Sequence, residues 1–171
     1  GGLNVPLNTE DSFYYGFTLD FRLILANLNP GQLIMSSIDE NGKGIELKTG
    51  NFGAIEITMS DGDQTASWSS DPGLVKANGV EHCISVTVDN GPRIIQFVID
   101  GVYNNGRECR QFGWGRYTVD MRDFHFNTID VHKMAGESVN IQSKITNLRL
   151  YNQPLKNTEI IGNHRNFLSN Q

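Results

Sequence analysis

The sequence lacks the features that would link it to a membrane or to nucleic acid. Among its 171 residues, no apolar run approaches the roughly 20 residues that a membrane-spanning helix needs. The 14 lysines and arginines form no basic run, and 19 acidic residues outnumber them, so the formal net charge is −5. Nucleic acid and anionic membrane surfaces both favour positively charged partners. We therefore expect neither nucleic-acid binding nor membrane insertion.

Cysteine is also scarce, because Cys83 and Cys109 are the only two and cannot form a disulfide framework. They form one disulfide if the fold brings them close enough, and otherwise they remain two thiols; their spacing in the sequence leaves both possibilities open. His82 adjoins Cys83, but neighbouring residues of a strand point to opposite faces and make poor catalytic partners. We expect His82 at a strand end, with its polar tip at the rim.

Recognisable metal and nucleophile motifs are missing. The histidines show no zinc-ligand spacing, and the sequence contains neither a twelve-residue calcium loop nor a Gly-x-Ser-x-Gly elbow. The turns do hold hard oxygen donors, and Asp61, Asp63 and Asp89 are candidate ligands for a structural calcium ion. The same side chains also close turns without any metal, so both interpretations stay open. We expect no other cofactor.

What the sequence does contain is short alternating segments separated by glycine-rich turns, with 18 glycines in all. Alternation of apolar and polar residues places one face of a strand in a core and the other in solvent. Such segments predict strands over residues 17–23, 33–38, 45–48, 54–59, 64–68, 82–89, 93–100 and 144–151. Residues 117–130 look like a loose segment without clear periodicity.

One short helix is expected at the C-terminal end of the sequence, over residues 157–168. Asn157 or Thr158 is the expected cap, and Ile160, Ile161 and Phe167 supply its apolar side. About ten short strands with turns about every 8 to 12 residues are typical of an antiparallel β-sandwich or barrel. No linker or repeat interrupts the sequence, so residues 1–171 are expected to form one domain.

Several stretches resemble the laminin-G-like, concanavalin A-like jelly-roll domains. They are a strand, an Asp89-Asn90-Gly91-Pro92 turn, a second strand ending Ile99-Asp100-Gly101, and a final Ile145-Thr146-Asn147-Leu148-Arg149-Leu150-Tyr151 before a helix with Glu159. The stretches 70–73 and 110–116 look like a subgroup appended to bacterial carbohydrate-active enzymes. The resemblance covers about Phe17 to Phe167 and implies a two-sheet sandwich. It also implies an extracellular, cell-surface or periplasmic location.

Catalytic laminarinase-type relatives carry Glu-x-Asp-x-x-Glu on one strand, and this motif is absent here. The nearest acidic strand positions, Glu46 and Glu56, each lie between apolar residues, as alternation alone would produce on a half-buried strand. An enzyme that draws its carboxylates from separate strands is therefore the least favoured hypothesis. Arg22, Arg93 and Arg149 look like ordinary outward strand or turn positions.

The stretch RQFGWGRY, residues 110–117, suggests sugar binding. A sugar ring is matched by an exposed aromatic ring for its C–H face and by planar polar groups for its hydroxyls. The loop leading to Tyr117 has this composition, and Trp68 lies beside another polar turn, so the two could converge on one site. The candidate ligand-binding residues are Trp68, Asp71, Tyr103, Asn105, Glu108, Arg110, Trp114 and Arg116. Trp114 could also fold back as a plug for the core.

The hypothesis that these features favour is a non-catalytic carbohydrate-binding module that recognises an oligo- or polysaccharide. The family resemblance suggests that it is attached to, or partners, a glycoside hydrolase or another glycan-active catalytic domain. The alternative is a protein-binding or adhesion module of the laminin-G type.

Overall fold

The computed structural model describes residues 3–6, 14–77, 79–104, 115–117, 128–131 and 144–169. Within these ranges the chain is almost entirely β-structure, with a short 3₁₀ turn, η1 (Asn51–Gly53), and one α-helix, α1 (Asn157–Leu168). The strands are β1 (Leu3–Pro6), β2 (Gly16–Ile24), β3 (Leu33–Ser36), β4 (Lys43–Thr49), β5 (Ile55–Asp61), β6 (Thr65–Ser69), β7 (Glu81–Asp89), β8 (Ile94–Ile99), β9 (Val102–Asn104), β10 (Gly115–Arg116), β11 (Thr128–Val131) and β12 (Lys144–Tyr151).

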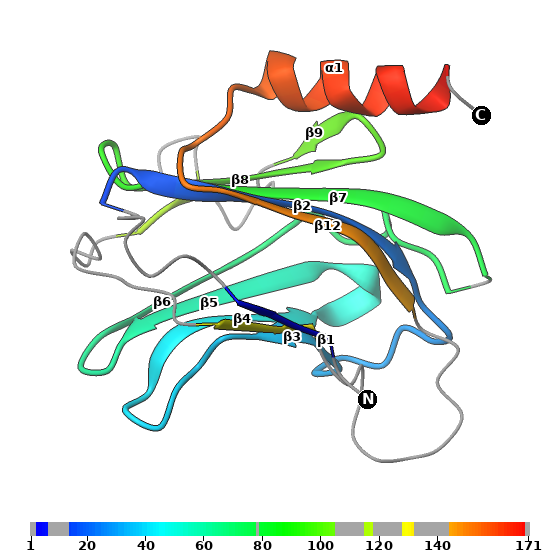
Figure 1. The fold of residues 1–171 in the computed structure, drawn as a ribbon. Coiled ribbons are helices and arrows are strands. Elements are labelled where there is room, and N and C mark those ends of the chain that lie inside the picture. The colour runs from blue at the N-terminus through cyan, green and yellow to red at the C-terminus, as the bar shows by residue number, and fades with distance from the viewer. Residues whose placement is uncertain are drawn as a thin grey trace.

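The strands form two antiparallel sheets that face each other as a β-sandwich (Figure 1). The first sheet has the strand order β1-β11-β3-β4-β5-β6, and the second has the order β10-β8-β7-β2-β12, with β9 also paired to β8. The helix α1 lies across the outer face of the second sheet (Figure 1). The predicted all-β sandwich with one C-terminal helix is therefore confirmed. No helix in the described ranges has the length and apolarity to cross a bilayer.

Alternation explains the core between the sheets. On β2, Leu19, Phe21 and Leu23 are fully or almost fully buried, while the residues between them face outward and are more polar. The same pattern on β4 and β5 turns Leu47 and Ile57 toward the same core. Burying these apolar side chains between two sheets is the main favourable contribution to folding.

Four strands and the helix cap differ from the prediction. The strands β1, β9, β10 and β11 were not predicted, and β11 begins inside the segment that looked loose. Each has two to four residues, too few for alternation to be recognised. The predicted Asn157 or Thr158 cap is wrong, since Lys156 is the N-cap and its N–H donates to Glu159 Oε2 at 2.8 Å.

Candidate functional site

Most of the ligand site predicted from the sequence lies outside the described residues. This holds for Asn105, Glu108, Arg110 and Trp114, and for the side chain of Arg116. The flanking strands place the two ends of segment 105–114. Asn104 at the end of β9 pairs with Phe97, and Gly115 at the start of β10 pairs with Ile95, both along the edge of β8 that faces away from β7. Phe97 and Ile95 are two residues apart on β8, which corresponds to about 7 Å along the strand. Segment 105–114 therefore begins and ends at nearly the same point of the sheet edge.

Asp71 lies beside the start of this segment. Its backbone N–H donates a hydrogen bond to Asn104 Oδ1 at 3.1 Å, and both residues are buried. This bond joins the turn after β6, in the first sheet, to β9 in the second. Two of the loops that the sequence suggested as convergent are therefore held together at their bases.

The structure does not bring Tyr103 to the same place. Tyr103 pairs with Val98 and packs in a small apolar cluster with Leu155 and Ile160 below α1. Its hydroxyl is buried and has no hydrogen-bond partner among the described residues. Trp68, on β6, is half-buried and packs against the main core. Trp68 thus contributes to packing, whatever else it contacts.

The residue that sequence reasoning missed is Phe52. It lies in η1 between β4 and β5, and 79% of its surface is exposed. Its backbone has a φ of 53°, in the left-handed region that a bulky residue normally avoids. Holding a non-glycine residue there costs on the order of 1–3 kcal/mol, and such strain clusters at ligand-contacting positions. A sequence signal existed, since Gly50-Asn51-Phe52-Gly53 places an aromatic between glycines much as Gly113-Trp114-Gly115 does.

The loops 27–32 and 70–75 lie against the segment that carries Phe52, and we call residues 27–32, 50–54 and 70–75 together the Phe52 rim. The Phe52 carbonyl accepts a hydrogen bond from Gly73 N at 2.7 Å, which attaches the turn after β6. Thr49 Oγ1 donates to the Asn29 carbonyl at 2.6 Å, which attaches the loop after β2. Because Asn29 and Asn51 are exposed, the rim combines an exposed aromatic ring with amide side chains. This combination can contact both the apolar face and the hydroxyls of a sugar.

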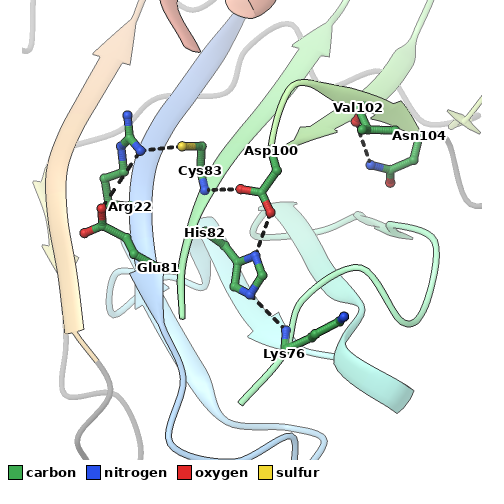
Figure 2. A network of polar contacts seen from close by, with 8 residues as sticks. All are labelled: Arg22, Lys76, Glu81, His82, Cys83, Asp100, Val102 and Asn104. Atoms are coloured by element: carbon green, nitrogen blue, oxygen red, sulfur yellow. Dashed lines mark hydrogen bonds and ion pairs between the residues drawn. The ribbon is translucent and has the colours of Figure 1, made fainter. Parts of the chain in front are cut away.

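A separate polar network joins β7 to the β8–β9 turn. Asp100 Oδ1 accepts from Cys83 N at 2.8 Å, and Asp100 Oδ2 lies 2.7 Å from His82 Nδ1 (Figure 2). On the other side of the ring, His82 Nε2 accepts a hydrogen bond from Lys76 N at 3.0 Å. Nε2 is therefore unprotonated, and Nδ1 carries the proton that it donates to Asp100.

This network is structural. Both nitrogens of His82 are engaged, so neither can serve as a base toward a substrate, and the ring is only 4% exposed. The expectation that His82 has its polar tip at the rim is wrong, because the strap before β7, the connection from β6 that contains Lys76, covers the ring. As predicted, His82 and Cys83 lie on opposite faces of β7, since His82 is paired with Leu23 on the core side and Cys83 with Arg22 on the outer side.

Comparison with solved structures places this arrangement among known folds. The binding domain of botulinum neurotoxin serotype C1 has a TM-score of 0.72 and 15% identity, covering 96% of this chain and 40% of that chain. A botulinum neurotoxin type C structure, described as entering cells through interaction with two ganglioside molecules, has a TM-score of 0.70 and 17% identity, covering 97% and 40%. The binding domain of botulinum neurotoxin DC in complex with rat synaptotagmin II has a TM-score of 0.72 and 15% identity, covering 97% and 40%.

These likenesses establish the fold. This chain spans about two fifths of the length of the neurotoxin chains, at identities that carry no residue-level correspondence. No family model and no curated protein matches the sequence. The laminin-G, concanavalin A-like type of the sandwich stays a prediction.

Two of the three candidate calcium ligands, Asp61 and Asp89, close their own turns. Asp61 Oδ1 accepts from the backbone of Asp63 at 2.9 Å and of Gln64 at 2.7 Å, and Asp89 Oδ1 accepts from Gly91 N at 3.1 Å. No group of three His, Cys, Asp or Glu residues suited to a metal occurs among the residues that the structure describes. The calcium ion stays a prediction.

Glu46 and Glu56 lie on the outer face of the first sheet, as alternation predicts. They are half-buried on the neighbouring strands β4 and β5, where Glu46 pairs with Thr58 and Glu56 with Lys48. Glu46 forms an ion pair with Lys48 at 2.5 Å, and Glu56 Oε2 accepts from Ser69 Oγ at 3.3 Å. Both carboxylates therefore have partners on the sheet surface.

Cys83 is a free thiol, and Cys109 lies outside the described residues. Burial raises the pKa of the Cys83 thiol from 9.0 to about 11, an effect that the adjacent Arg22 guanidinium partly opposes. Because only the thiolate is a good nucleophile, Cys83 should be inert near neutral pH.

We expect alkylation of Cys83 by iodoacetamide at pH 9 to be about fiftyfold slower than that of an ordinary thiol, because only about 1% is ionised. Peptide mapping by mass spectrometry separates Cys83 from Cys109, and the denatured chain supplies the reference rate. Equal alkylation rates of Cys83 in the folded and the denatured chain would contradict the raised pKa and the burial of this thiol. Since the unfolded thiol ionises first, its contribution to stability should decrease as the pH rises from 9.0 through about 11.

Proposed function

We propose that this protein is a non-catalytic carbohydrate-binding module in which Phe52 stacks against a sugar ring. The observation that carries the proposal is the 79% exposure of Phe52 on a left-handed backbone. An exposed aromatic ring is suited to the C–H face of a pyranose. Loops at the end of a rigid sandwich are also where binding residues commonly lie.

The polar contacts would come from the rest of the Phe52 rim and from segment 105–114. Asn29 and Asn51 offer exposed amide groups in the loops of the rim, and the Asp71–Asn104 bond holds the base of segment 105–114 next to the rim. We propose that Trp114, with Arg110 and Arg116, completes the site from that segment. The arginines are suited to vicinal hydroxyls or to a carboxylate.

The fold likeness supports a binding role. Botulinum neurotoxin type C, described as interacting with gangliosides, shares this sandwich. We propose an oligo- or polysaccharide as the ligand, encountered in an extracellular, cell-surface or periplasmic location. A glycoside hydrolase or another glycan-active catalytic domain, joined in the same polypeptide or binding separately, would benefit from a module that holds it near its polysaccharide.

The test compares two replacements of Phe52. Phe52→Ala and Phe52→Gly should each reduce glycan affinity at least about fivefold, since stacking on an aromatic ring contributes roughly 1–3 kcal/mol. Phe52→Gly should also leave the free energy of unfolding unchanged or raise it by up to about 1 kcal/mol, because glycine relieves the left-handed strain. A glycan array identifies the ligand, and calorimetry measures both variants.

Tyr15→Ala is the matched control, because Tyr15 is 72% exposed and lies just before β2 of the other sheet. Wild-type affinity in both Phe52 variants would exclude Phe52 from the site. Loss of binding in Trp114→Ala alone would move the site to segment 105–114. Absence of binding to every glycan would refute the proposed function.

A protein-binding role of the laminin-G type is the second candidate. One observation favours it: Tyr14 and Tyr15 are both exposed and pack edge to face, with ring centroids 5.1 Å apart. Exposed aromatic pairs are common anchors at protein interfaces. In that case Tyr15→Ala, rather than Phe52→Ala, would abolish partner binding.

A further inference from the structure

The second sheet and α1 enclose a cavity of about 240 Å³ on the side of the molecule that carries the helix. Its walls come from β2, β7, β8, β12 and from α1, which lies across the sheet in Figure 1. The volume corresponds to about eight water molecules at roughly 30 Å³ each. This is somewhat less than the roughly 300 Å³ at which pockets for drug-sized ligands begin, and it suits a single sugar ring.

The helix presents polar residues to this cavity where apolar ones are the rule. Positions 160, 163, 164 and 167 follow helical spacing and line the cavity together, and two of them are Asn163 and His164. An α-helix that only had to cover a sheet would carry apolar residues along this whole stripe. The opposing sheet surface is also polar, with Asp20 and Ser85 facing the helix.

One buried polar atom in this wall has no partner. His164 Nδ1 is buried without a hydrogen bond to any described residue. The Cδ2 edge of the ring faces Gly101, since a Cβ built on that glycine would lie 2.8 Å from Cδ2. Nδ1 therefore lies on the side of the ring away from Gly101. A buried polar group without a partner is costly, so a bound group or water is expected there.

Of the two arginines that line the cavity, Arg22 is bound to neighbouring residues and Arg149 is available to a ligand. Arg22 faces outward from β2, as expected, but it is not an ordinary surface position, because α1 covers it and its side chain is only 12% exposed. Its guanidinium lies 3.3 Å above the Phe167 ring, donates to Cys83 Sγ and is 4.0 Å from Glu81. Arg149 is exposed, and no carboxylate of the described residues lies within 4.0 Å of its guanidinium.

Asp20 pairs with Arg149 in the register of β2 and β12 but forms no ion pair with it. Instead, Asp20 Oδ1 accepts a hydrogen bond from Ser85 Oγ at 2.9 Å, and Oδ2 is left as an acceptor. A bulge interrupts the ladder of β12 and β2 between Thr146 and Arg149, with a φ of 53° at Asn147, and the pairing resumes at Arg149. An arginine fork and a carboxylate thus line the same small cavity.

The geometry points to a second binding site in this cavity, for a single acidic sugar such as a hexuronate. The Arg149 guanidinium would bind the sugar carboxylate through paired N–H donors. Asp20 Oδ2 would accept from a sugar hydroxyl, and the Asn163 amide and His164 would meet the remaining hydroxyls. This site is on the outer face of the second sheet and is independent of the Phe52 rim.

The experiment titrates the isotope-labelled 171-residue chain with sodium galacturonate and follows backbone amide shifts, with calorimetry for affinity. Galacturonate should shift the amides of α1 and β12 and bind in the millimolar range, whereas galactose and sodium acetate should each bind at least about tenfold more weakly. Arg149→Gln should weaken galacturonate binding at least about tenfold. Arg165→Gln, an exposed position on the same helix, is the matched control and should bind normally.

Asn163→Phe, which fills the cavity from the helix, should also abolish binding and gives a second test if Arg149→Gln fails to fold. Absence of shifts on α1 and β12, or equal binding by Arg149→Gln and Asn163→Phe, would overturn the site. Equal affinity for galactose or acetate would overturn the acidic sugar as its ligand. Phe52→Ala should leave the galacturonate response intact, so failure of this proposal is distinguishable from failure of the proposed rim site.

Discussion

Replacing Gly53 by alanine should lower the free energy of unfolding by about 3 kcal/mol, from left-handed strain together with overpacking. Gly53 has a φ of 75°, and a Cβ at this position would lie 2.4 Å from the Val75 carbonyl oxygen. Val75 is itself a buried core residue, so its carbonyl oxygen cannot move aside cheaply. The turn after β6 would have to separate from η1, and chemical denaturation would measure the loss.

Gly73→Ala provides the matched control. Gly73 has a similar φ of 78°, but nothing lies within 4 Å of the position of its Cβ. Only the left-handed strain remains there, which costs about 1–2 kcal/mol. Equal losses in the two variants would show that close approach at Gly53 contributes nothing. Since Gly53 adjoins Phe52, Gly53→Ala should also lower the affinity of the Phe52 rim for its ligand, while Tyr15→Ala should leave that affinity unchanged.

The second large effect is expected at Asp100. Asp100→Ala should lower the free energy of unfolding by about 3 kcal/mol, because it leaves two buried donors, His82 Nδ1 and Cys83 N, without their acceptor. Alanine would also take over a backbone with a φ of 51°, which aspartate and asparagine tolerate better. Thermal and denaturant unfolding would measure the loss of stability. The nitrogen chemical shifts of the His82 ring would report its tautomer.

Asp100→Asn should lose about half as much. Its side-chain oxygen can still accept from Cys83 N, but its amide would face the Nδ1–H of His82, donor against donor. Asp63→Ala, an exposed turn position, should be neutral. A neutral Asp100→Ala variant would mean that the His82 contact seen in Figure 2 contributes nothing to stability.

Much of the fold was predictable because strand and helix periodicity is local. The predicted helix over 157–168 is α1, and the predicted strand over 144–151 is β12, with the same bounds. Long alternating segments such as 17–23 and 82–89 were found within a residue or so at each end. The inward-facing residues of these strands could be named, since alternation assigns each residue to a face.

The candidate site could be predicted only in part. Asp71 was a candidate ligand-binding residue in a loop that could converge with the Trp114 loop; its backbone N–H donates to Asn104 Oδ1, beside the start of segment 105–114, and its role in ligand binding stays a prediction. Phe52 was missed, because a lone aromatic between glycines has no periodicity, and its exposure depends on loops that meet only in the fold. Segment 105–114 with Trp114 lies outside the described residues, so whether Trp114 is a plug or a platform stays a prediction.

The sequence by itself determined the elements and the class of fold: short alternating strands, glycine-rich turns and one terminal helix can bury their apolar faces only by stacking sheets. Only the tertiary structure decided the surroundings of individual side chains. Arg22 and His82 look like surface residues in the sequence, yet α1 covers one and the strap before β7 covers the other. The reason is physical: periodicity reports which face a side chain is on, while the burial, charge partners and reactivity of that side chain depend on distant segments that pack against that face.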